Sequence, residues 1–270
     1  MAYFTAEDGC RIFYEERGSG QPVILIHGWS GNRHFFRKQV PAFARKYRVL
    51  AYDLRGHGDS DRPETGLYME QYARDLKGLI GSLNLKNVVL IGWSMGVQVI
   101  WEYIKEFGCC NLKKIVLADM TPKMMAEPGE DWPYAIWGGY SRADAMTYME
   151  RIARNWEKCA AGFVPAIFSD GPCREDIPWV LNQVLKNTPH VMINMWLAIL
   201  QKDYRDLMGQ IQVPCLYTYG RRKSMCSPEI ADWLKVRIPD CSTAGFDGGH
   251  IQFLQDAENF NQVVFEFLGK

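Results

Sequence analysis

The amino-acid sequence predicts an α/β fold, with a mostly parallel central sheet that carries helices on both faces. One observation is alternation, because short apolar runs are followed by longer stretches whose apolar positions recur at helical spacing. A second is the character of the short runs, which are branched and uncharged, as strands covered on both faces should be. A third is length, since 270 residues can bury a substantial core. Folds of this type bind ligands at the carboxyl ends of their strands.

Residues 1–120 and 209–270 are expected to form the α/β core. An antiparallel strand is predicted over 11–16, and the helix predicted from Phe35 to Tyr47 contains Pro41 as an interruption. The other elements of the first part are strands over 23–26, 48–52, 88–91 and 115–118, and helices over 68–83 and 97–107. Those of the second part are a strand over 213–219, a helix over 228–236, a short strand over 243–246 and a terminal helix over 259–268.

Residues 121–208 differ in character from both flanks. Strand-like runs are absent from this segment, tryptophans and methionines are frequent, and helices are predicted over Tyr148 to Trp156 and Trp179 to Leu200. We expect a helical cap inserted at the strand ends, which acts as a lid, rather than a separate domain. Its apolar side chains either form the packing core of the helices or line a pocket for a hydrophobic substrate group.

The pentapeptide Gly92-Trp93-Ser94-Met95-Gly96 lies between a predicted strand and a predicted helix. So sharp a reversal forces Ser94 into a strained backbone conformation and lifts its hydroxyl clear of the sheet. Glycines are needed at 92 and 96, where side chains would collide with the neighbouring strand and helix. The helix N-terminus beneath the serine favours developing negative charge. The pattern predicts that Ser94 is a nucleophile.

An activated serine needs a base, a group that orients the base, and donors for the oxyanion. His250 follows Gly248-Gly249, between the last strand and the last helix, where a loop can carry an imidazole over the sheet. His27 and His57 lie in glycine turns, where hydrogen bonding to the backbone is the expected role. We therefore predict that His250 is the base, among five histidines at 27, 34, 57, 190 and 250.

Composition excludes several classes of function. The formal net charge is zero, which gives no electrostatic case for binding nucleic acid or an acidic membrane. No apolar stretch reaches the length of a membrane span and the first residues do not open a signal peptide, so a cytoplasmic protein is expected. The eight cysteines are scattered without a C-x-x-C pair. Reduced thiols are expected rather than a disulfide framework or a structural zinc site.

Four segments make the chain resemble the α/β-hydrolase superfamily, in its serine-nucleophile carboxylesterase and haloperoxidase-like branch with a helical cap. They are His27-Gly28-Trp29, Asp53 to Ser60, Gly92 to Gly96 and Gly249-His250. The resemblance implies an oxyanion hole formed by the backbone N–H groups of Trp29 and Met95. It also implies structural roles for His27 and for the turn from Asp53 to Ser60, and it implies no cofactor and no metal.

The acid departs from the most frequent family pattern. Members usually carry an aspartate in the loop after the next-to-last strand, and the corresponding position here is Lys223, which cannot stabilise an imidazolium. A second arrangement in the superfamily places the acid after the strand that follows the elbow helix, where this chain has Asp119. We predict Asp119 as the acid. Asp247, close to His250 in sequence, and a serine–histidine dyad without an acid are the alternatives.

The resemblance and the serine together imply acyl transfer to water through an acyl-enzyme. The expected partner is a small-molecule ester, and the expected activity is that of a carboxylesterase on small to medium apolar esters. Lactone hydrolysis and cofactor-free peracid formation would use the same residues and stay open as alternatives. A weakly catalytic small-molecule receptor on the same scaffold is a further alternative.

Overall fold

An eight-stranded sheet forms the centre of the molecule in the computed structural model, which describes residues 2–168, 173–222 and 225–270. Within those ranges the strand order is β1-β2-β4-β3-β5-β6-β7-β8, and every pairing outside β1 and β2 is parallel. The strands are β1 (Ala2–Thr5), β2 (Arg11–Arg17), β3 (Pro22–Ile26), β4 (Arg48–Tyr52), β5 (Val88–Trp93), β6 (Leu112–Ala118), β7 (Cys215–Gly220) and β8 (Cys241–Phe246). The predicted α/β class is confirmed.

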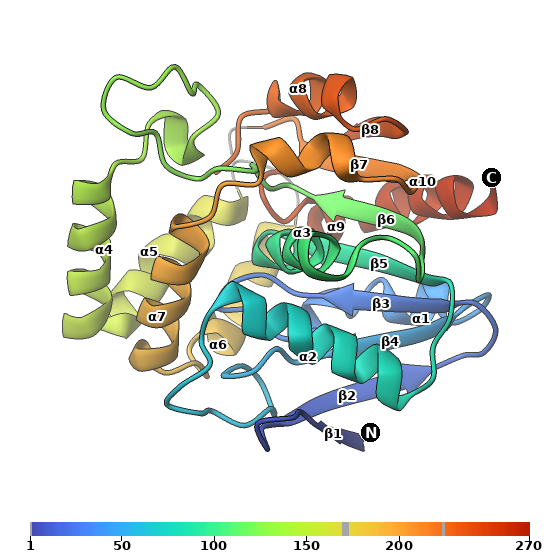
Figure 1. Cartoon of the computed structure of the whole chain (residues 1–270). Helices are drawn as coiled ribbons and strands as arrows, with labels where there is room; N and C mark the ends of the chain where they lie inside the picture. Colours follow the sequence, from blue (N-terminus) through green and yellow to red (C-terminus); the bar gives the residue numbers. More distant parts are fainter. Residues whose placement is uncertain (1, 169–172, 223–224) are drawn as a thin grey trace.

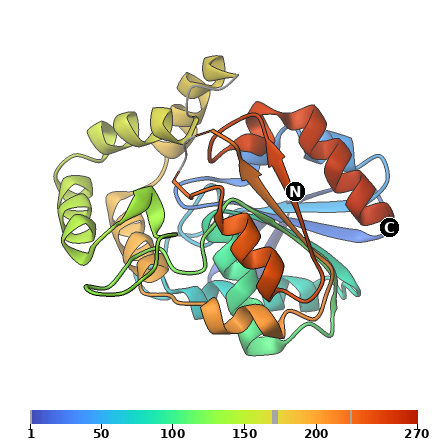
Figure 2. The ribbon, with the colours of Figure 1, turned by 90° about the horizontal axis from the view of Figure 1, so that it is seen from above.

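Helices cover both faces of this sheet. Figures 1 and 2 show α2, α3 and α8 on one face and α1 and α10 on the other. These helices, with the short α9, are α1 (Val40–Phe43), α2 (Met69–Ser82), α3 (Met95–Phe107), α8 (Ile230–Arg237), α9 (Gln252–Gln255) and α10 (Ala257–Gly269). The helical spacing read in α3 is confirmed, because Val97, Ile100, Trp101 and Ile104 are all buried. Burying each such side chain stabilises the fold by roughly 1.5–3 kcal/mol.

Two long predicted helices differ from the structure near a proline; the interruption near Pro41 was expected, whereas the break before Pro189 was not. In place of the helix from Phe35 to Tyr47 the chain forms a 3₁₀ turn, η1 (Arg33–Phe36), and the four-residue α1, which has Pro41 in its first turn. A proline lacks the N–H that a helix interior requires, so it is favoured in the first turn of a helix, although α5 accommodates Pro165. The predicted helix from Trp179 to Leu200 likewise splits, because Pro189 begins a new helix. Strand β1 was not predicted; it is a four-residue edge strand with alternating exposure.

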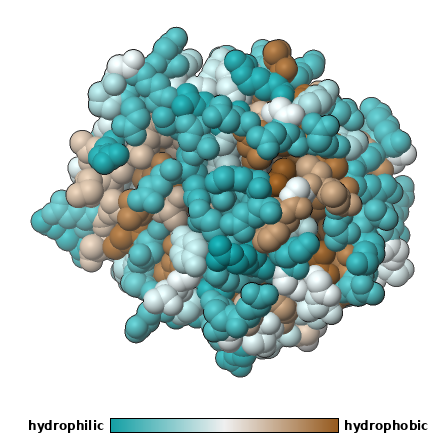
Figure 3. All heavy atoms as spheres, in the orientation of Figure 1, coloured by the Kyte–Doolittle hydropathy of each residue, from teal (hydrophilic) through white to brown (hydrophobic). Residues whose placement is uncertain are grey.

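The segment between β6 and β7 lies over the carboxyl ends of the parallel strands (Figure 1). The predicted helix ending at Trp156 is wrong at its end, because Asn155 leaves helical geometry and a second helix starts at Trp156. Apolar atoms reach the surface over α4 and α7 (Figure 3), where Met146 and Leu197 are exposed. The elements are η2 (Ile136–Gly138), α4 (Arg142–Arg154), α5 (Trp156–Phe168), η3 (Arg174–Asp176), α6 (Ile177–Val184), α7 (Pro189–Leu200) and η4 (Arg205–Gln210).

Two expectations from composition can be compared with the structure. All eight cysteines are free thiols, as the scattered spacing predicts. None of the helices in the described part of the chain combines the length and apolar character that a bilayer span needs.

Candidate active site

Ser94 occupies the turn between β5 and α3 with backbone angles of φ 54° and ψ −121°. A non-glycine residue at positive φ is strained, and such strain persists only where the surroundings hold it. Here the Ser94 N–H donates to the Ala118 carbonyl at 2.9 Å, and the Ser94 carbonyl accepts from the Val97 N–H at 2.8 Å. The predicted nucleophile elbow geometry is therefore present at the carboxyl end of β5.

Three glycines allow the backbone to pack this closely around Ser94. A Cβ atom on Gly96 would lie 2.2 Å from the Ile26 carbonyl oxygen, and one on Gly92 would lie 2.6 Å from the Gly96 carbonyl oxygen. A Cβ atom on Gly28 would lie 2.9 Å from the Ser94 Cβ. The sequence argument for glycine at 92 and 96 rested on these collisions, and Gly28 adds a third position of close approach.

We expect Gly96→Ala to destabilise the protein by more than about 3 kcal/mol, because the methyl group meets backbone atoms that no side-chain rotation can move. Gly81→Ala is the matched control, since Gly81 lies in α2 with no atom within 4 Å of its added Cβ. That change should stabilise by about 0.5–1 kcal/mol. Urea unfolding of the two variants measures both effects. Equal stabilities would contradict the close approach at the elbow.

His250 and Asp119 form a buried pair across the top of the sheet. The His250 Nδ1 and the Asp119 Oδ2 are 2.7 Å apart. Asp119 directly follows β6 with φ 53°, so its strained backbone turns the carboxylate out of the strand. Because Nδ1–H donates to Asp119, the Nε2 of His250 keeps its lone pair and can act as a base.

The loop that carries His250 is fixed at several points. Gly249 packs against the end of β7, where a Cβ atom on Gly220 would lie 2.2 Å from the Gly249 carbonyl oxygen. The Gly249 N–H donates to the Gln255 side chain at 2.8 Å. The Trp93 indole N–H donates to the His250 carbonyl at 2.7 Å. Trp93 immediately precedes Ser94, so one side chain ties the histidine loop to the serine turn, a contact that the sequence analysis missed.

The structure brings Asp119, and not Asp247, to the histidine. Asp247 is exposed and forms an ion pair with Arg222 at 2.6 Å, whose hydrogen bond lowers the pKa of Asp247. Lys223, which stands at the usual position of the acid, lies outside the described residues. Of the two carboxylates considered from the sequence, only Asp119 therefore has the geometry of an orienting acid.

Cys226 is a third group at this place, and the sequence analysis missed it. Its Sγ lies 3.8 Å from the Asp119 carbonyl oxygen, and the possible ligand atoms of Asp119, Cys226 and His250 lie within 4.8 Å of one another. Burial raises the pKa of the Cys226 thiol well above its usual value, which keeps the sulfur protonated at neutral pH.

Comparison with known proteins gives the family. The α/β-hydrolase fold family model matches residues 21–148. A Synechocystis sp. protein named as a non-heme chloroperoxidase is 37% identical over 269 residues, covering 95% of this chain and 94% of that protein. The chain belongs to the α/β-hydrolase fold family. Among solved structures, an esterase from Exiguobacterium antarcticum matches with a TM-score of 0.92 and 28% identity over 99% of both chains. A bromoperoxidase from Bacillus anthracis matches with a TM-score of 0.91 and 26% identity over 100% of this chain and 99% of the other.

In this hydrolase, Trp29 and Met95 flank the serine. Met95 is the first residue of α3, where helical N–H groups have no acceptor within the helix. Trp29 lies in the turn closed by the bond from the Gly31 N–H to the Gly28 carbonyl, and its indole donates to the Met192 carbonyl at 3.0 Å. Both residues are buried. Of the two backbone N–H groups named from the family resemblance, that of Met95 thus directly follows Ser94, and that of Trp29 follows Gly28, whose added Cβ would lie 2.9 Å from the Ser94 Cβ.

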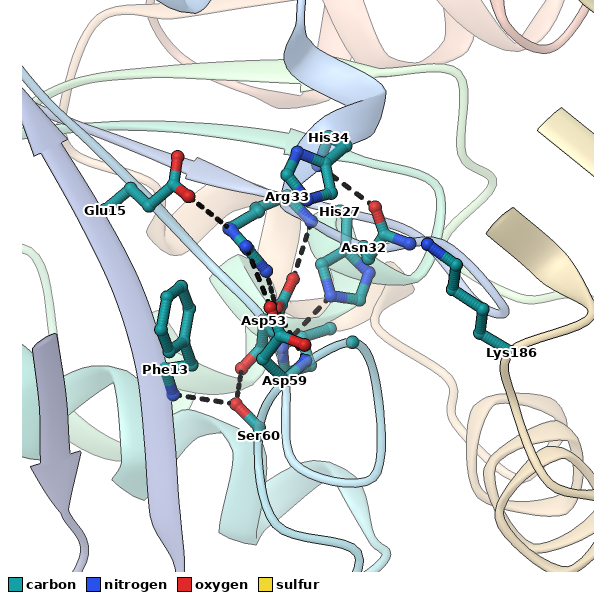
Figure 4. A network of polar contacts seen from close by, with 12 residues as sticks. Phe13, Glu15, His27, Asn32, Arg33, His34, Asp53, Asp59, Ser60 and Lys186 are labelled. Atoms are coloured by element: carbon teal, nitrogen blue, oxygen red, sulfur yellow. Dashed lines mark hydrogen bonds and ion pairs between the residues drawn. The ribbon is translucent and has the colours of Figure 1, made fainter. Parts of the chain in front are cut away.

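A polar network joins the turn of residues 53–60 to Arg33 in the segment that follows β3 (Figure 4). Asp53 accepts from the backbone N–H of Arg33 at 2.7 Å and from that of Asp59 at 2.9 Å. The Arg33 guanidinium forms ion pairs with Asp53, with Asp59 at 2.8 Å and with Glu15 at 3.1 Å. The Ser60 hydroxyl donates a hydrogen bond to the Asp53 carbonyl at 2.6 Å. Through these contacts the turn of residues 53–60 supports the loop after β3, which is a structural role.

His27 and His57 of the hydrolase are buried and bonded to backbone groups, as their glycine turns predict. The Nε2 of His27 accepts from the Leu54 N–H at 3.0 Å while its Nδ1 lies 2.8 Å from the Gly28 carbonyl oxygen. An imidazole that accepts at one nitrogen and donates at the other is neutral. Burial lowers the pKa of His27 to about 4, and burial together with the nearby His27 lowers that of His57 to about 3.

These two histidines predict a loss of stability in mild acid. Each folded-state pKa lies below the usual value of 6.5, so the unfolded chain binds protons that the folded chain does not. The contribution of the two neutral histidines to the free energy of unfolding is complete above pH 6.5. It is lost as the pH falls towards 4 for His27 and towards 3 for His57, at up to about 1.4 kcal/mol per pH unit for each. Urea unfolding between pH 7.5 and 5 measures this slope. His57→Gln should make it shallower, and an unchanged slope would contradict the assignment.

Proposed function

We propose that this protein is a serine esterase that hydrolyses small to medium apolar carboxylic esters through an acyl-enzyme. The observation that carries the proposal is the 2.7 Å contact between His250 Nδ1 and Asp119 Oδ2 at the same sheet edge as the strained turn of Ser94. A hydroxyl on a sharp turn and an oriented, buried imidazole with a free Nε2 are the parts that acyl transfer requires.

In the proposed reaction, Ser94 attacks the ester carbonyl while His250 takes its proton through Nε2 and returns it to the leaving alcohol. Asp119 stabilises the imidazolium that forms and holds the ring in the required tautomer. The backbone N–H groups of Trp29 and Met95 stabilise the oxyanion, each by roughly 3 kcal/mol. Water then attacks the acyl-enzyme, with His250 first as base and then as acid.

The segment over the strand ends supports an apolar substrate. The ring of Trp29 packs against three rings from α5 and α7. The distances between ring centroids are 5.6 Å to Trp156, 5.2 Å to Phe163 and 5.0 Å to Trp196. A wall of aromatic side chains beside the oxyanion turn favours a hydrophobic acyl or alcohol group over a sugar. We assign these helices the role of a lid over Ser94.

A panel of p-nitrophenyl esters of graded acyl length tests the proposal, with lactones and with acetate plus hydrogen peroxide as further substrates. Release of p-nitrophenol with saturation kinetics supports the esterase proposal. Faster hydrolysis of a lactone, or faster formation of a peracid, would instead identify that reaction as the activity of the same residues. Tight binding of an ester without turnover would indicate a receptor.

A further inference from the structure

A groove of about 720 Å³ crosses the outer part of the segment that we assign as the lid, between α4 and α5. Its volume is in the range of sites that bind small molecules. Aromatic rings and basic side chains both line it, and we name it the cationic lid groove. Its lining residues are Trp137, Tyr148, Arg151, Arg154, Asn155, Lys158, Cys159, Gly162, Phe163 and Ala166.

The basic side chains of the groove are only partly neutralised. Arg154 forms an ion pair with Glu150 one helical turn earlier. Within the described ranges, no carboxylate lies within 4 Å of the charged nitrogens of Arg151 or Lys158. Burial raises the pKa of the Cys159 thiol, and the positive charges of Arg151 and Lys158 both lower it. Arg151, Lys158 and Cys159 thus line the same groove, and among the described residues no carboxylate pairs with either cation within 4 Å.

Two of the residues that line the groove pack against Trp29. Tyr148 and Phe163, which line the groove, contact the ring of Trp29 with centroids 6.2 and 5.2 Å away. The backbone of Trp29 follows Gly28, whose position is so close to Ser94 that an added Cβ would lie 2.9 Å from the serine Cβ. Trp29 thus contacts the residues of the groove through its ring and follows, in the backbone, the glycine that packs against Ser94.

We propose that the cationic lid groove binds the anionic end of the substrate, so that the preferred esters carry a carboxylate at the end of the acyl chain remote from the ester. The apolar side of the groove, with Tyr148 and Phe163, accommodates the methylene groups, and Arg151 and Lys158 neutralise the carboxylate. This inference rests on the proposed esterase function and specifies its substrate class as half-esters of dicarboxylic acids.

Matched pairs of substrates test the inference. Mono-p-nitrophenyl esters of succinic, adipic and suberic acid are compared with the p-nitrophenyl alkanoates in which a methyl group replaces the distant carboxylate. We expect kcat/KM to favour the anionic ester at the chain length that spans Trp29. Arg151→Gln and Lys158→Gln should each lower the ratio of anionic to neutral kcat/KM by about tenfold. Raising the ionic strength should lower the ratio in the unsubstituted enzyme.

Arg142→Gln is the control, because Arg142 is exposed on the same helix as Arg151 and does not line the groove. Ser94-dependent hydrolysis with the same ratio in the Arg142, Arg151 and Lys158 variants would overturn the groove assignment while leaving the esterase proposal intact. A protein that hydrolyses neither member of any pair would overturn the esterase proposal and, with it, this inference. Competitive inhibition of neutral-ester hydrolysis by suberate, weakened in Arg151→Gln, is the corresponding equilibrium readout.

Discussion

Ser94→Ala is expected to lower kcat on p-nitrophenyl esters by roughly 10⁴- to 10⁶-fold, the range that loss of the nucleophile produces in serine hydrolases. The alanine cannot form the acyl-enzyme, so the reaction reverts to attack by water on a bound ester. Backbone donors and substrate binding remain, which leaves a residual rate above that in solution. Steady-state kinetics and a burst-phase experiment with excess ester measure the loss of turnover and the loss of the acyl-enzyme.

The variant should keep its fold, because the strained φ of residue 94 is held by backbone hydrogen bonds that alanine also makes. Ser82→Ala is a suitable control, since Ser82 ends α2 and its hydroxyl only bonds the Leu79 carbonyl. Hydrolysis by Ser94→Ala within tenfold of the unsubstituted enzyme would transfer the nucleophilic role to another group, of which the Cys226 thiol beside Asp119 is the first to test.

The elbow could be predicted because it depends on neighbours in sequence. A buried strand, two glycines and a run of apolar residues at helical spacing all lie within 20 residues. The strand and the helix each begin and end within a few residues of the predicted positions. The helix from Trp179 to Leu200 was predicted wrongly for a local reason as well: the helical spacing continues through Pro189, whereas the backbone is extended at Thr188 and a new helix begins at Pro189. The groove could not be predicted, since Arg151 lies in α4 and Lys158 lies in α5. The spacing of apolar residues in the sequence does not determine the angle between these two helices.

Placement of the acid has a simple explanation in the sheet. Strands β6 and β7 are parallel neighbours in register, with Ala118 opposite Thr218, and the Asp119 N–H donates to the Thr218 carbonyl at 2.8 Å. The end of β6 therefore lies beside Thr218, one strand spacing of about 4.8 Å away, and β7 continues to Gly220, after which the family usually carries its aspartate. A carboxylate at either strand end can reach the same imidazole nitrogen. The lysine at 223 is compatible with an acid supplied from β6 instead.

Asp119→Asn is expected to lower kcat by about 10⁴-fold with little change in KM. The asparagine amide can donate to Nδ1 and would then favour the tautomer with its hydrogen on Nε2, which cannot accept the serine proton. It also removes the negative charge that stabilises the imidazolium. Asp247→Asn is the matched control, because Asp247 is exposed and paired with Arg222. We expect that change to alter kcat less than twofold. Both measurements use the same p-nitrophenyl ester at saturating concentration.

A second variant separates the charge of Asp119 from its packing. Cys226→Ser keeps a small hydrogen-bonding group beside Asp119, so it should lower kcat far less than Asp119→Asn does. If Asp119→Asn instead retained near-normal turnover while Asp247→Asn lost it, the acid would lie on the β8 loop and the 2.7 Å contact would be structural. Equal turnover in both asparagine variants would mean that His250 works as a dyad with Ser94. The three outcomes differ by orders of magnitude in kcat, so one kinetic series on these variants decides which carboxylate orients the base.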